Sequence, residues 1–270
     1  MTVLRRKLAE AKAERRAALV GYYPAGFPDV ASSIRVVQAM VAGGCDVIEV
    51  GFPYSDPTMD GPVIQQAADR ALAAGTTPKD VLAVVRAVAD AGAAALVMSY
   101  WNPIEKYGVD AFAADLAAAG GSGLITPDLI PEEAEPWIKA SDAAGIDRIF
   151  LVAPSSTDER LAKTCAASRG FVYAASLMGV TGTRDKVAAT ARRLVERTRA
   201  VTRDSGLPIC VGLGISNGAQ AAEVASYADG VIVGTGFCQR VLDAPDVDTA
   251  CQQVRDFAAE LAAGVRAAAR

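Results

Sequence analysis

The stretch DVIEVGFPYSDPTMDGP, residues 46–62, combines a strand, a loop and the start of a helix. Residues 47–50 form a short β-branched run that ends at Gly51, a pattern typical of a strand. Residues 52–61 hold two prolines, several short polar residues and a glycine, which predicts a loop. Pro62 then opens an apolar helical pattern, in the first-turn position that proline favours. The stretch therefore predicts one strand–loop–helix unit of an α/β protein.

Two acidic residues of this stretch are candidates for catalysis. Glu49 lies inside the predicted strand, between Ile48 and Val50, and a glutamate in an apolar strand is costly unless it is paired, neutralised or used. It either faces water as an ordinary strand residue or acts as a general acid/base whose pKa is raised by an apolar site. Asp60 lies at the far end of the loop, next to the helix. If the protein is a barrel, both acids are expected at the mouth formed by the carboxyl ends of the strands.

Short, continuous, apolar runs alternate with helical patterns along the rest of the chain, as in parallel strands that are covered on both sides. An amphipathic helix with Leu4 and Leu8 on its inner side precedes the first run. The predicted strands cover residues 17–23, 47–50, 95–99, 123–126, 147–152, 171–174, 208–211 and 230–233. These eight units predict an α/β protein, a (β/α)8 TIM barrel with an extra N-terminal helix, and an open doubly wound sheet is the alternative. No linker interrupts the pattern, so residues 1–270 are expected to form a single TIM-barrel domain.

Composition excludes several kinds of partner. The chain has 270 residues, a net charge of −4 and a pI of about 5.1, so it lacks the basic surface that nucleic acids require. Its uncharged runs are broken by Gly, Pro and Asn, so no membrane span is expected, and the charged N-terminal residues are not expected to form a secretory signal. The five cysteines are odd in number and mostly have apolar neighbours, which predicts buried free thiols and a cytoplasmic location.

Histidine is absent from the sequence. The usual proton carrier near pH 7 is therefore missing, and a Ser-His-Asp triad and the common histidine zinc sites are excluded. We expect no metal, and if the protein is an enzyme, carboxylates, tyrosines or lysines must move its protons. No lysine lies in a predicted strand, which argues against a Schiff-base aldolase, and a metal aldolase would normally use histidine ligands.

Three glycine-rich segments closely follow predicted strands, at residues 179–183, 212–216 and 234–236. Glycine lets backbone N–H groups approach an anion, and barrels often hold a phosphate in the loops after their last two strands, beside a short extra helix. Residues 237–242 are the candidate for that helix. Tight turns that need glycine are the alternative. The middle segment is not a dinucleotide fingerprint, because Asn217 stands where the third glycine belongs.

These exclusions leave carbon–carbon cleavage open only for a substrate that carries its own electron sink. An indole is such a group, because protonation at C3 gives an indoleninium into which the adjacent C–C bond can break. The reaction needs an acid near C3, a base for the proton of the departing hydroxyl and an anion near the ring N–H. Two carboxylates at one mouth meet these needs, although the residues alone do not name indole.

Residues 46–62 closely resemble the signature of the tryptophan synthase α-chain family, I-E-x-G-x-P-x-S-D-P-x-x-D-G-P. The resemblance covers nearly the whole chain in order, through YWNP, PDL, FVY, GVTG and GLGI at residues 100–103, 127–129, 171–173, 179–182 and 212–215. It implies cleavage of indole-3-glycerol phosphate to indole and glyceraldehyde 3-phosphate, with no cofactor in this chain. It also implies a partner, a PLP-dependent β-chain in an α2β2 complex, which receives the indole through a tunnel.

The resemblance also implies roles for individual residues. Glu49 corresponds to the general acid/base, and Asp60 to the carboxylate that stabilises the charged ring at its N–H. Tyr173 resembles the family's mouth tyrosine beside Glu49. Thr181 resembles the loop residue that holds Asp60 when the site closes, and Gly182 its neighbour at the phosphate. The phosphate cradle corresponds to Gly212, Leu213, Gly214, Gly234 and Thr235, the surroundings of the indole to Tyr22, Tyr100 and Leu124, and the contacts with the β-chain to Pro53, Asp56 and Asn102.

The sequence departs from the family's usual residues at Tyr22, Thr58, Met59, Leu177, Leu213 and Thr235. Residues 176–184 interleave glycines with small polar residues, which predicts a mobile lid. Asp128 is either a further site carboxylate or a loop cap. Two other functions stay open at this point: an interaction subunit that mainly activates a β-chain, and a free-standing lyase that releases indole on its own.

Overall fold

The structure, a computed structural model, describes residues 1–175 and 184–268. In this part of the chain, nine strands form one sheet in the order β5-β4-β3-β2-β1-β9-β8-β7-β6, and all neighbouring strands are parallel. The two end strands, β5 (Asp147–Ile149) and β6 (Leu151–Val152), are pieces of one predicted strand, separated only by Phe150. The sheet therefore closes on itself through this strand. The predicted barrel is confirmed, and the open doubly wound sheet is wrong.

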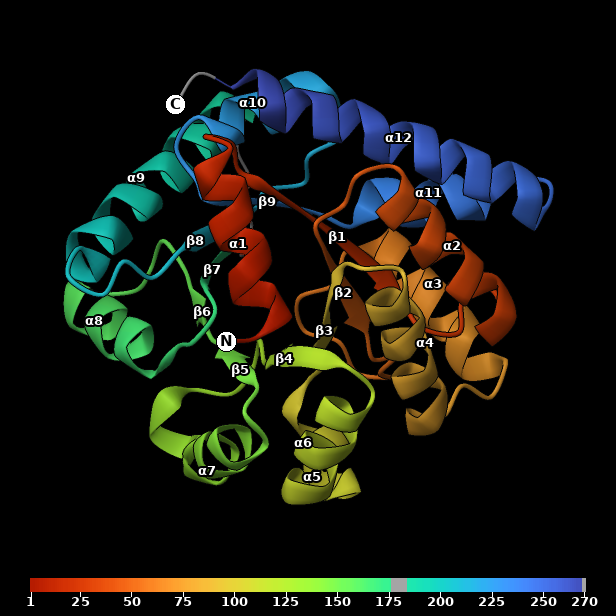
Figure 1. The fold of residues 1–270 in the computed structure, drawn as a ribbon, viewed down its shortest axis with the longest axis horizontal. Helices are drawn as coiled ribbons and strands as arrows, with labels where there is room; N and C mark the ends of the chain where they lie inside the picture. The colour runs from red at the N-terminus through yellow and green to blue at the C-terminus, as the bar shows by residue number, and fades with distance from the viewer. Residues whose placement is uncertain (176–183, 269–270) are drawn as a thin grey trace.

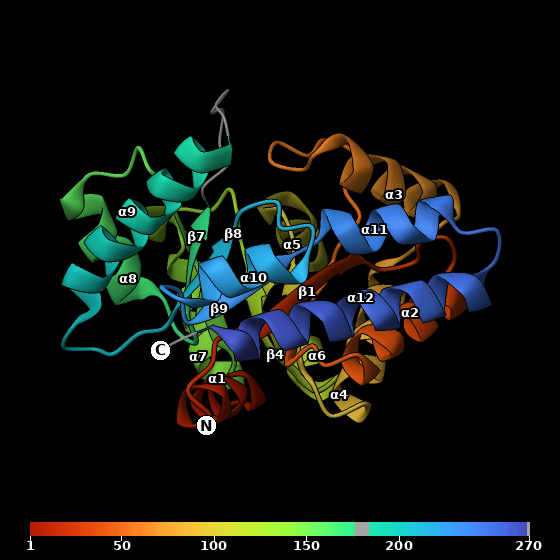
Figure 2. The same ribbon diagram turned by 90° about the horizontal axis from the view of Figure 1, so that it is seen from above.

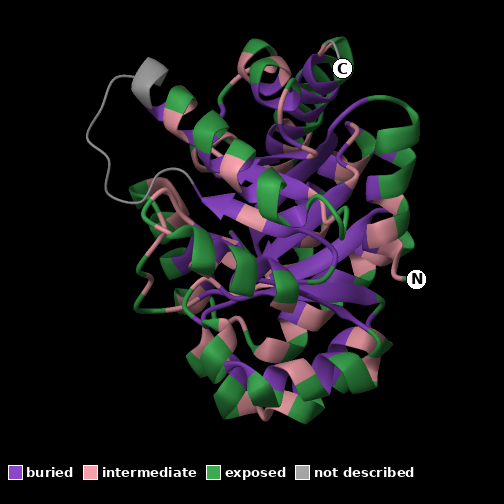
Figure 3. Cartoon of the chain, turned by 90° about the vertical axis from the view of Figure 1, so that its left-hand side faces the viewer, coloured by how far each residue is buried: buried purple, intermediate pink, exposed green. Residues whose placement is uncertain are grey.

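The other strands lie where the apolar runs predict them. They are β1 (Ala18–Pro24), β2 (Val47–Gly51), β3 (Ala94–Met98), β4 (Gly121–Ile125), β7 (Val172–Ala175), β8 (Ile209–Gly212) and β9 (Gly230–Val233). Buried residues occupy nearly every strand position, because the inner face packs in the barrel and the outer face packs against helices. Figure 3 shows this contrast, with the strands largely buried and the helices exposed on one side.

Helices form a ring around the strands (Figure 1). In chain order they are α2 (Val30–Ala42), α3 (Pro62–Ala73), α4 (Pro78–Asp90), α5 (Trp101–Tyr107), α6 (Val109–Ala118), α7 (Glu135–Ala144), α8 (Asp158–Ala167), α9 (Arg184–Thr202), α10 (Gly218–Ala225), α11 (Thr235–Asp243) and α12 (Val247–Ala267), with a 3-10 turn, η1 (Pro131–Glu133), before α7. The short helix expected after the last strand is confirmed as α11. Among the described residues, no helix is both long and apolar enough to cross a membrane.

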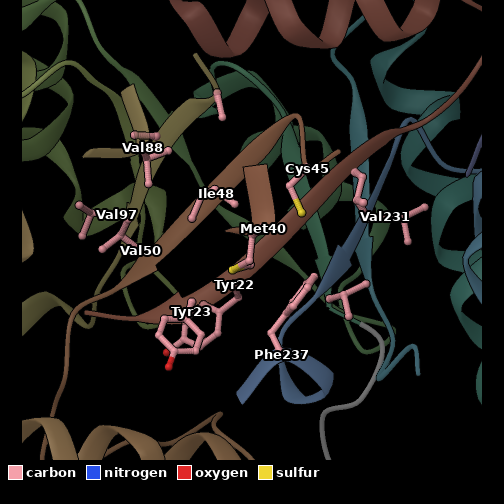
Figure 4. Close-up of a cluster of buried hydrophobic side chains, with 14 of the residues drawn as sticks. Tyr22, Tyr23, Met40, Cys45, Ile48, Val50, Val88, Val97, Val231 and Phe237 are labelled. Atoms are coloured by element: carbon pink, nitrogen blue, oxygen red, sulfur yellow. The ribbon is translucent and has the colours of Figure 1, made fainter. Parts of the chain in front are cut away.

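Two sets of buried side chains make up the core. The inner set joins alternate strand residues such as Val47 to Leu8 of the N-terminal helix. The outer set lies between the strands and the ring of helices, and Figure 4 shows Ile48 and Val50 within it. All five cysteines are free thiols, and all except Cys251 are buried, as the sequence predicts.

The N-terminal helix α1 (Val3–Ala13) lies across the amino end of the barrel, on the side opposite the loop before α3 (Figure 1, Figure 2). Its N-cap is Thr2, whose side chain accepts a hydrogen bond from the backbone N–H of Arg5. The Arg5 guanidinium pairs with Asp147 of β5, with Nε 2.8 Å from Oδ1, and the Asp147 side chain has no exposed surface. The predicted extra helix is therefore confirmed, and an ion pair fixes it to the barrel floor.

One local prediction is wrong. The Asn-Pro pair at residues 102–103 predicts a loop after the third strand, but α5 begins at Trp101. The carboxylate of Asp128 accepts the Trp101 N–H, with distances of 2.9 and 3.1 Å to its two oxygens. Pro103 lies in the first turn, where the N–H that it lacks has no partner in a helix. Asp128 is thus a helix cap and not a site carboxylate.

Candidate active site

A cleft of about 770 Å³ opens where the strands end and the following loops begin. It brings together many of the residues that the sequence singles out: Tyr22, Glu49, Asp60, Tyr173, Gly212, Leu213, Gly214, Gly234 and Thr235. Residues that sequence reasoning missed complete the lining: Thr58, Met59, Gly61, Ile64, Met98, Ala175 and Ile232. Of these, Met98 and Ala175 are the last residues of their strands. The carboxyl end of a barrel strand lies at the active-site mouth, so their position could have identified them as site residues from the sequence.

Glu49 points into the barrel from β2. It shares a strand face with Val47 of the inner set, whereas Ile48 and Val50 face outward. No part of Glu49 is exposed, and neither carboxyl oxygen has a hydrogen-bond partner among the described residues. Burial raises its pKa to about 8, because the ionised form loses its hydration. The alternative of a water-facing residue is therefore wrong, and near pH 7 Glu49 is mostly a neutral acid with a proton to donate.

Asp60 reaches the same cleft from the loop before α3. Gln65 Nε2 donates to its backbone carbonyl at 2.6 Å. Burial raises the pKa of the Asp60 carboxyl, and a hydrogen bond from Tyr100 opposes part of this rise. Tyr22 lies beside Glu49 in the register of β1 and β2, and its pKa is raised first by burial and next by the charge of Asp60. The two acids therefore share one mouth.

Tyr173 approaches both acids from β7. Burial raises the pKa of its phenol most, and the negative charges of the two carboxylates add to this rise. Its hydroxyl leaves no room for a side chain at Gly212, where a Cβ would lie 2.4 Å from Tyr173 Oη. Gly51 similarly makes room for Tyr22, because a Cβ there would lie 2.3 Å from Tyr22 Oη. Both glycines thus allow a tyrosine hydroxyl to lie next to the backbone at the mouth.

One part of the cleft suits an anion. Gly234 and Thr235 line it at the start of α11, where the first N–H groups have no partner within the helix and the helix dipole is positive. Gly214 also lines it and has a left-handed φ of +64°, which favours glycine. No lysine or arginine is found among the described lining residues. An anion here depends on backbone N–H groups and not on basic side chains.

Some predicted site residues do not reach the cleft. Leu124 is fully buried in the outer set, because its neighbour Ile125 takes the inner face, so its assignment to the indole pocket is wrong. Tyr100 is also buried and lies behind the loop that carries Asp60, where it contacts the backbone of that loop. Outside the described residues lie Leu177, Thr181, Gly182, the glycine-rich segment 179–183 and, except for its last residue, the predicted lid.

The residues expected to meet a β-chain divide into two groups. Asp56 and Asn102 are exposed, as an interface requires. Pro53 is buried within the chain, so its side chain is not accessible to a partner in this structure.

Fold and site together define the class of the protein. It is a TIM-barrel enzyme that is equipped to move protons with carboxylates on an anionic substrate. Among the residues that the structure describes, no group of three or more His, Cys, Asp or Glu side chains could hold a metal ion.

Comparison with known proteins identifies the family. The sequence model described as "Tryptophan synthase alpha chain" matches residues 8–266. The tryptophan synthase alpha chain of Acidothermus cellulolyticus is 59% identical over 266 residues, 98% of each chain, and that of Mycobacteroides abscessus is 60% identical over 257 residues, 95% of each chain. A crystal structure of tryptophan synthase from M. tuberculosis matches with a TM-score of 0.89 at 52% identity, covering 98% of this chain and 99% of that one. The chain therefore belongs to the tryptophan synthase alpha chain family.

Membership confirms the predicted reaction class. The chain is a lyase of tryptophan biosynthesis that cleaves indole-3-glycerol phosphate. This reaction needs no cofactor of its own in the family, since pyridoxal phosphate belongs to the β-chain.

Proposed function

We propose that Glu49 and Asp60 carry out the retro-aldol cleavage of indole-3-glycerol phosphate to indole and glyceraldehyde 3-phosphate. The observation that carries this proposal is the complete burial of Glu49 without a hydrogen-bond partner among the described residues, which keeps its carboxyl protonated near pH 7. A carboxylic acid in this state is suited to protonate carbon.

The steps follow from this assignment. Glu49 gives its proton to C3 of the indole, and the ring nitrogen becomes a cationic iminium. The carboxylate of Asp60 lies near the ring N–H and stabilises that positive charge. The ionised Glu49 then takes the proton of the side-chain hydroxyl next to C3. The C–O bond becomes a carbonyl, the C–C bond breaks, and its electron pair restores the neutral indole.

The phosphate of the substrate binds at the start of α11. Gly234 and Thr235 present backbone N–H groups there, and Gly214 lies on the same cleft. Gly212 and Leu213 keep their predicted place in the phosphate cradle, and Tyr22 lies beside the indole. Thr181 and Gly182 keep the roles that the resemblance implies, Thr181 as the residue that holds Asp60 when the site closes and Gly182 as its neighbour at the phosphate.

The partner is a tryptophan synthase β-chain, and the assembly is an α2β2 complex in which the β-chain receives indole. The similarity to solved structures of M. tuberculosis tryptophan synthase supports this assignment, as does the exposure of Asp56 and Asn102. The free cysteines and the family's biosynthetic role support a cytoplasmic location. All described strands belong to one sheet, and no linker interrupts the chain, which supports a single domain.

Substitution of Glu49 tests the function. Glu49→Gln should lower the rate of indole release from indole-3-glycerol phosphate by at least about 10²-fold, because the general acid is lost. Glu133→Gln, at an exposed position, is the matched control and should keep the wild-type rate. Near-normal turnover of folded Glu49→Gln sinks the assignment. Assays with and without a β-chain also separate the lyase from a subunit that only activates its partner.

A further inference from the structure

The cleft explains only part of the glycine-rich segment 234–236. Gly234 and Thr235 line the cleft, whereas Gly236 is not among its described lining residues. A Cβ at Gly236 would lie 2.7 Å from Cε1 of Phe257 and 3.6 Å from Nη1 of Arg240. The missing side chain therefore lets the first turn of α11 approach these two residues, on the flank of the helix that packs against α12 (Figure 2).

The side chain of Arg240 turns back along α11 toward the start of the helix. Arg240 lies one turn after Gly236, and its Nη1 donates to the Gly236 carbonyl at 2.8 Å. Its guanidinium carbon lies 3.5 Å from the centroid of the Phe257 ring, in a cation–π contact. The Phe257 ring also packs edge-on against Phe237 of α11, with centroids 5.0 Å apart. These contacts hold the cation beside Gly236, the residue that follows Thr235.

No carboxylate of the described part of the chain forms an ion pair with Arg240, whose side chain is partly buried. Burial lowers the pKa of the guanidinium, and the negative charge of Glu260 opposes part of this effect. The Glu260 carboxylate itself accepts the backbone N–H of Gly218, at 2.8 Å. Arg240 is therefore a partly dehydrated cation, and an anion bound nearby would stabilise it.

We propose that Arg240 is a positioning residue for the substrate phosphate, and that its guanidinium provides the positive charge that the described lining of the cleft lacks. This inference rests on the proposed function, because it requires the phosphate at the start of α11. No side chain caps α11 at Gly234, so the first backbone N–H groups are available to the anion, and the charge of Arg240 adds to their field. A cation about 10 Å from an anion at a partly buried site changes the binding constant of that anion by about fivefold to tenfold.

Arg240→Met tests this role, because it keeps an unbranched side chain against Phe257 and removes the charge. KM for indole-3-glycerol phosphate should rise by about fivefold to tenfold, and kcat should change by less than about twofold, since the phosphate is held equally in the ground state and the transition state. Arg240→Lys keeps the charge, so its KM should stay within about twofold of the wild-type value.

Arg266→Met is the matched control. The Nη1 of Arg266 also donates to a carbonyl one turn earlier in its helix, that of Ala262 at 3.2 Å. Its charge, however, acts on Glu14, which caps the end of α1 on the opposite side of the barrel from the cleft. Arg266→Met should therefore keep the wild-type KM.

Product inhibition separates the charge of Arg240 from its packing. Inhibition by glyceraldehyde 3-phosphate should weaken in Arg240→Met by the same factor as KM rises, whereas inhibition by neutral indole should not change. An unchanged KM in Arg240→Met overturns the inference, and so does equal weakening of both products or a KM in Arg240→Lys as high as in Arg240→Met. Glu49→Gln is measured alongside. Near-normal turnover in that variant refutes the proposed function, whereas lost turnover there with an unaffected Arg240→Met refutes only this inference.

Discussion

The buried carboxyl of Glu49 makes the stability of the fold depend on pH. In the folded chain its pKa is about 8, against an ordinary value of 4.5, because burial penalises the ionised form. The folded state therefore binds a proton that the unfolded chain releases between these two pH values. Stability falls as pH rises from about 4.5 to about 8, and above that it stays at the lower level. Glu49→Gln keeps the shape of the side chain and removes this titration.

The magnitude follows from the size of the shift. One pKa unit corresponds to about 1.4 kcal/mol of difference between the two protonation states. The rise from 4.5 to about 8 then amounts to about 5 kcal/mol above pH 8, and to about 3 kcal/mol at pH 7. At low pH Glu49 is neutral in both the folded and the unfolded state, so the difference in free energy of unfolding between Glu49→Gln and the wild type at that pH serves as the reference. Relative to this reference, the difference should shift in favour of Glu49→Gln by about 3 kcal/mol at pH 7 and by about 5 kcal/mol above pH 8. The group that serves catalysis thus destabilises the fold.

Equilibrium urea unfolding, followed by circular dichroism at acidic, neutral and alkaline pH, measures this effect. The quantity to compare is the free energy of unfolding of Glu49→Gln minus that of the wild type at each pH. Glu133→Gln, which alters an exposed carboxyl, should show a flat difference. If the difference for Glu49→Gln changes by less than about 1 kcal/mol between pH 5 and pH 9, the reasoning about an unpaired buried carboxyl is refuted.

Three further predictions concern the cleft and the barrel floor. Gly212→Ala places a methyl group 2.4 Å from the present position of the Tyr173 hydroxyl, so the ring must move, and kcat/KM in steady-state assays should fall by about tenfold or more. The rate of indole release should decline as pH rises through about 8, because the protonated form of Glu49 is the acid; a pH–rate profile measures this. Arg5→Ala leaves Asp147 buried without its cation, and should lower the free energy of unfolding in urea by about 3 kcal/mol or more.

These predictions have their own controls. Arg6→Ala removes a neighbouring arginine whose one ion pair among the described residues is with an exposed glutamate, and it should change stability by less than about 0.5 kcal/mol. Equal losses in Arg5→Ala and Arg6→Ala would contradict the role of Asp147. An unchanged kcat/KM in Gly212→Ala would contradict the close approach of Tyr173. A rate that stays level through pH 8 in the wild type, with Glu49 intact, would contradict the general-acid role.

The sequence predicts only part of the orientation of Glu49. Strand residues alternate between faces, so the sequence places Glu49 on the face opposite Ile48 and Val50, and the structure shows that this face is the inner one. The family resemblance alone assigns Leu124 to the indole pocket, because alternation does not say which of two adjacent apolar residues faces inward. The pairing of β3 with β4 shifts register between Ala95 and Leu96, and this irregularity cannot be read from the sequence pattern.

The features that sequence reasoning missed depend on contacts between distant residues. The start of α5 depends on the Asp128 carboxylate, which caps Trp101 from 27 residues away in the chain. Tyr100 looks like one more pocket aromatic in its motif, and only the fold shows its hydroxyl against the backbone of Thr58 and Met59. Motifs gave the residue types at the mouth correctly, but not which side chains act on others.

Helix α1, which Arg5 holds to the barrel, also limits the path by which indole can leave the molecule. Leu4 and Leu8 fill the amino end of the barrel together with strand residues such as Val20, so this end is closed by packed side chains. Indole released in the cleft cannot leave through the amino end of the barrel. The open way out is then the mouth of the barrel, near the exposed residues Asp56 and Asn102 that we propose as contacts with the β-chain.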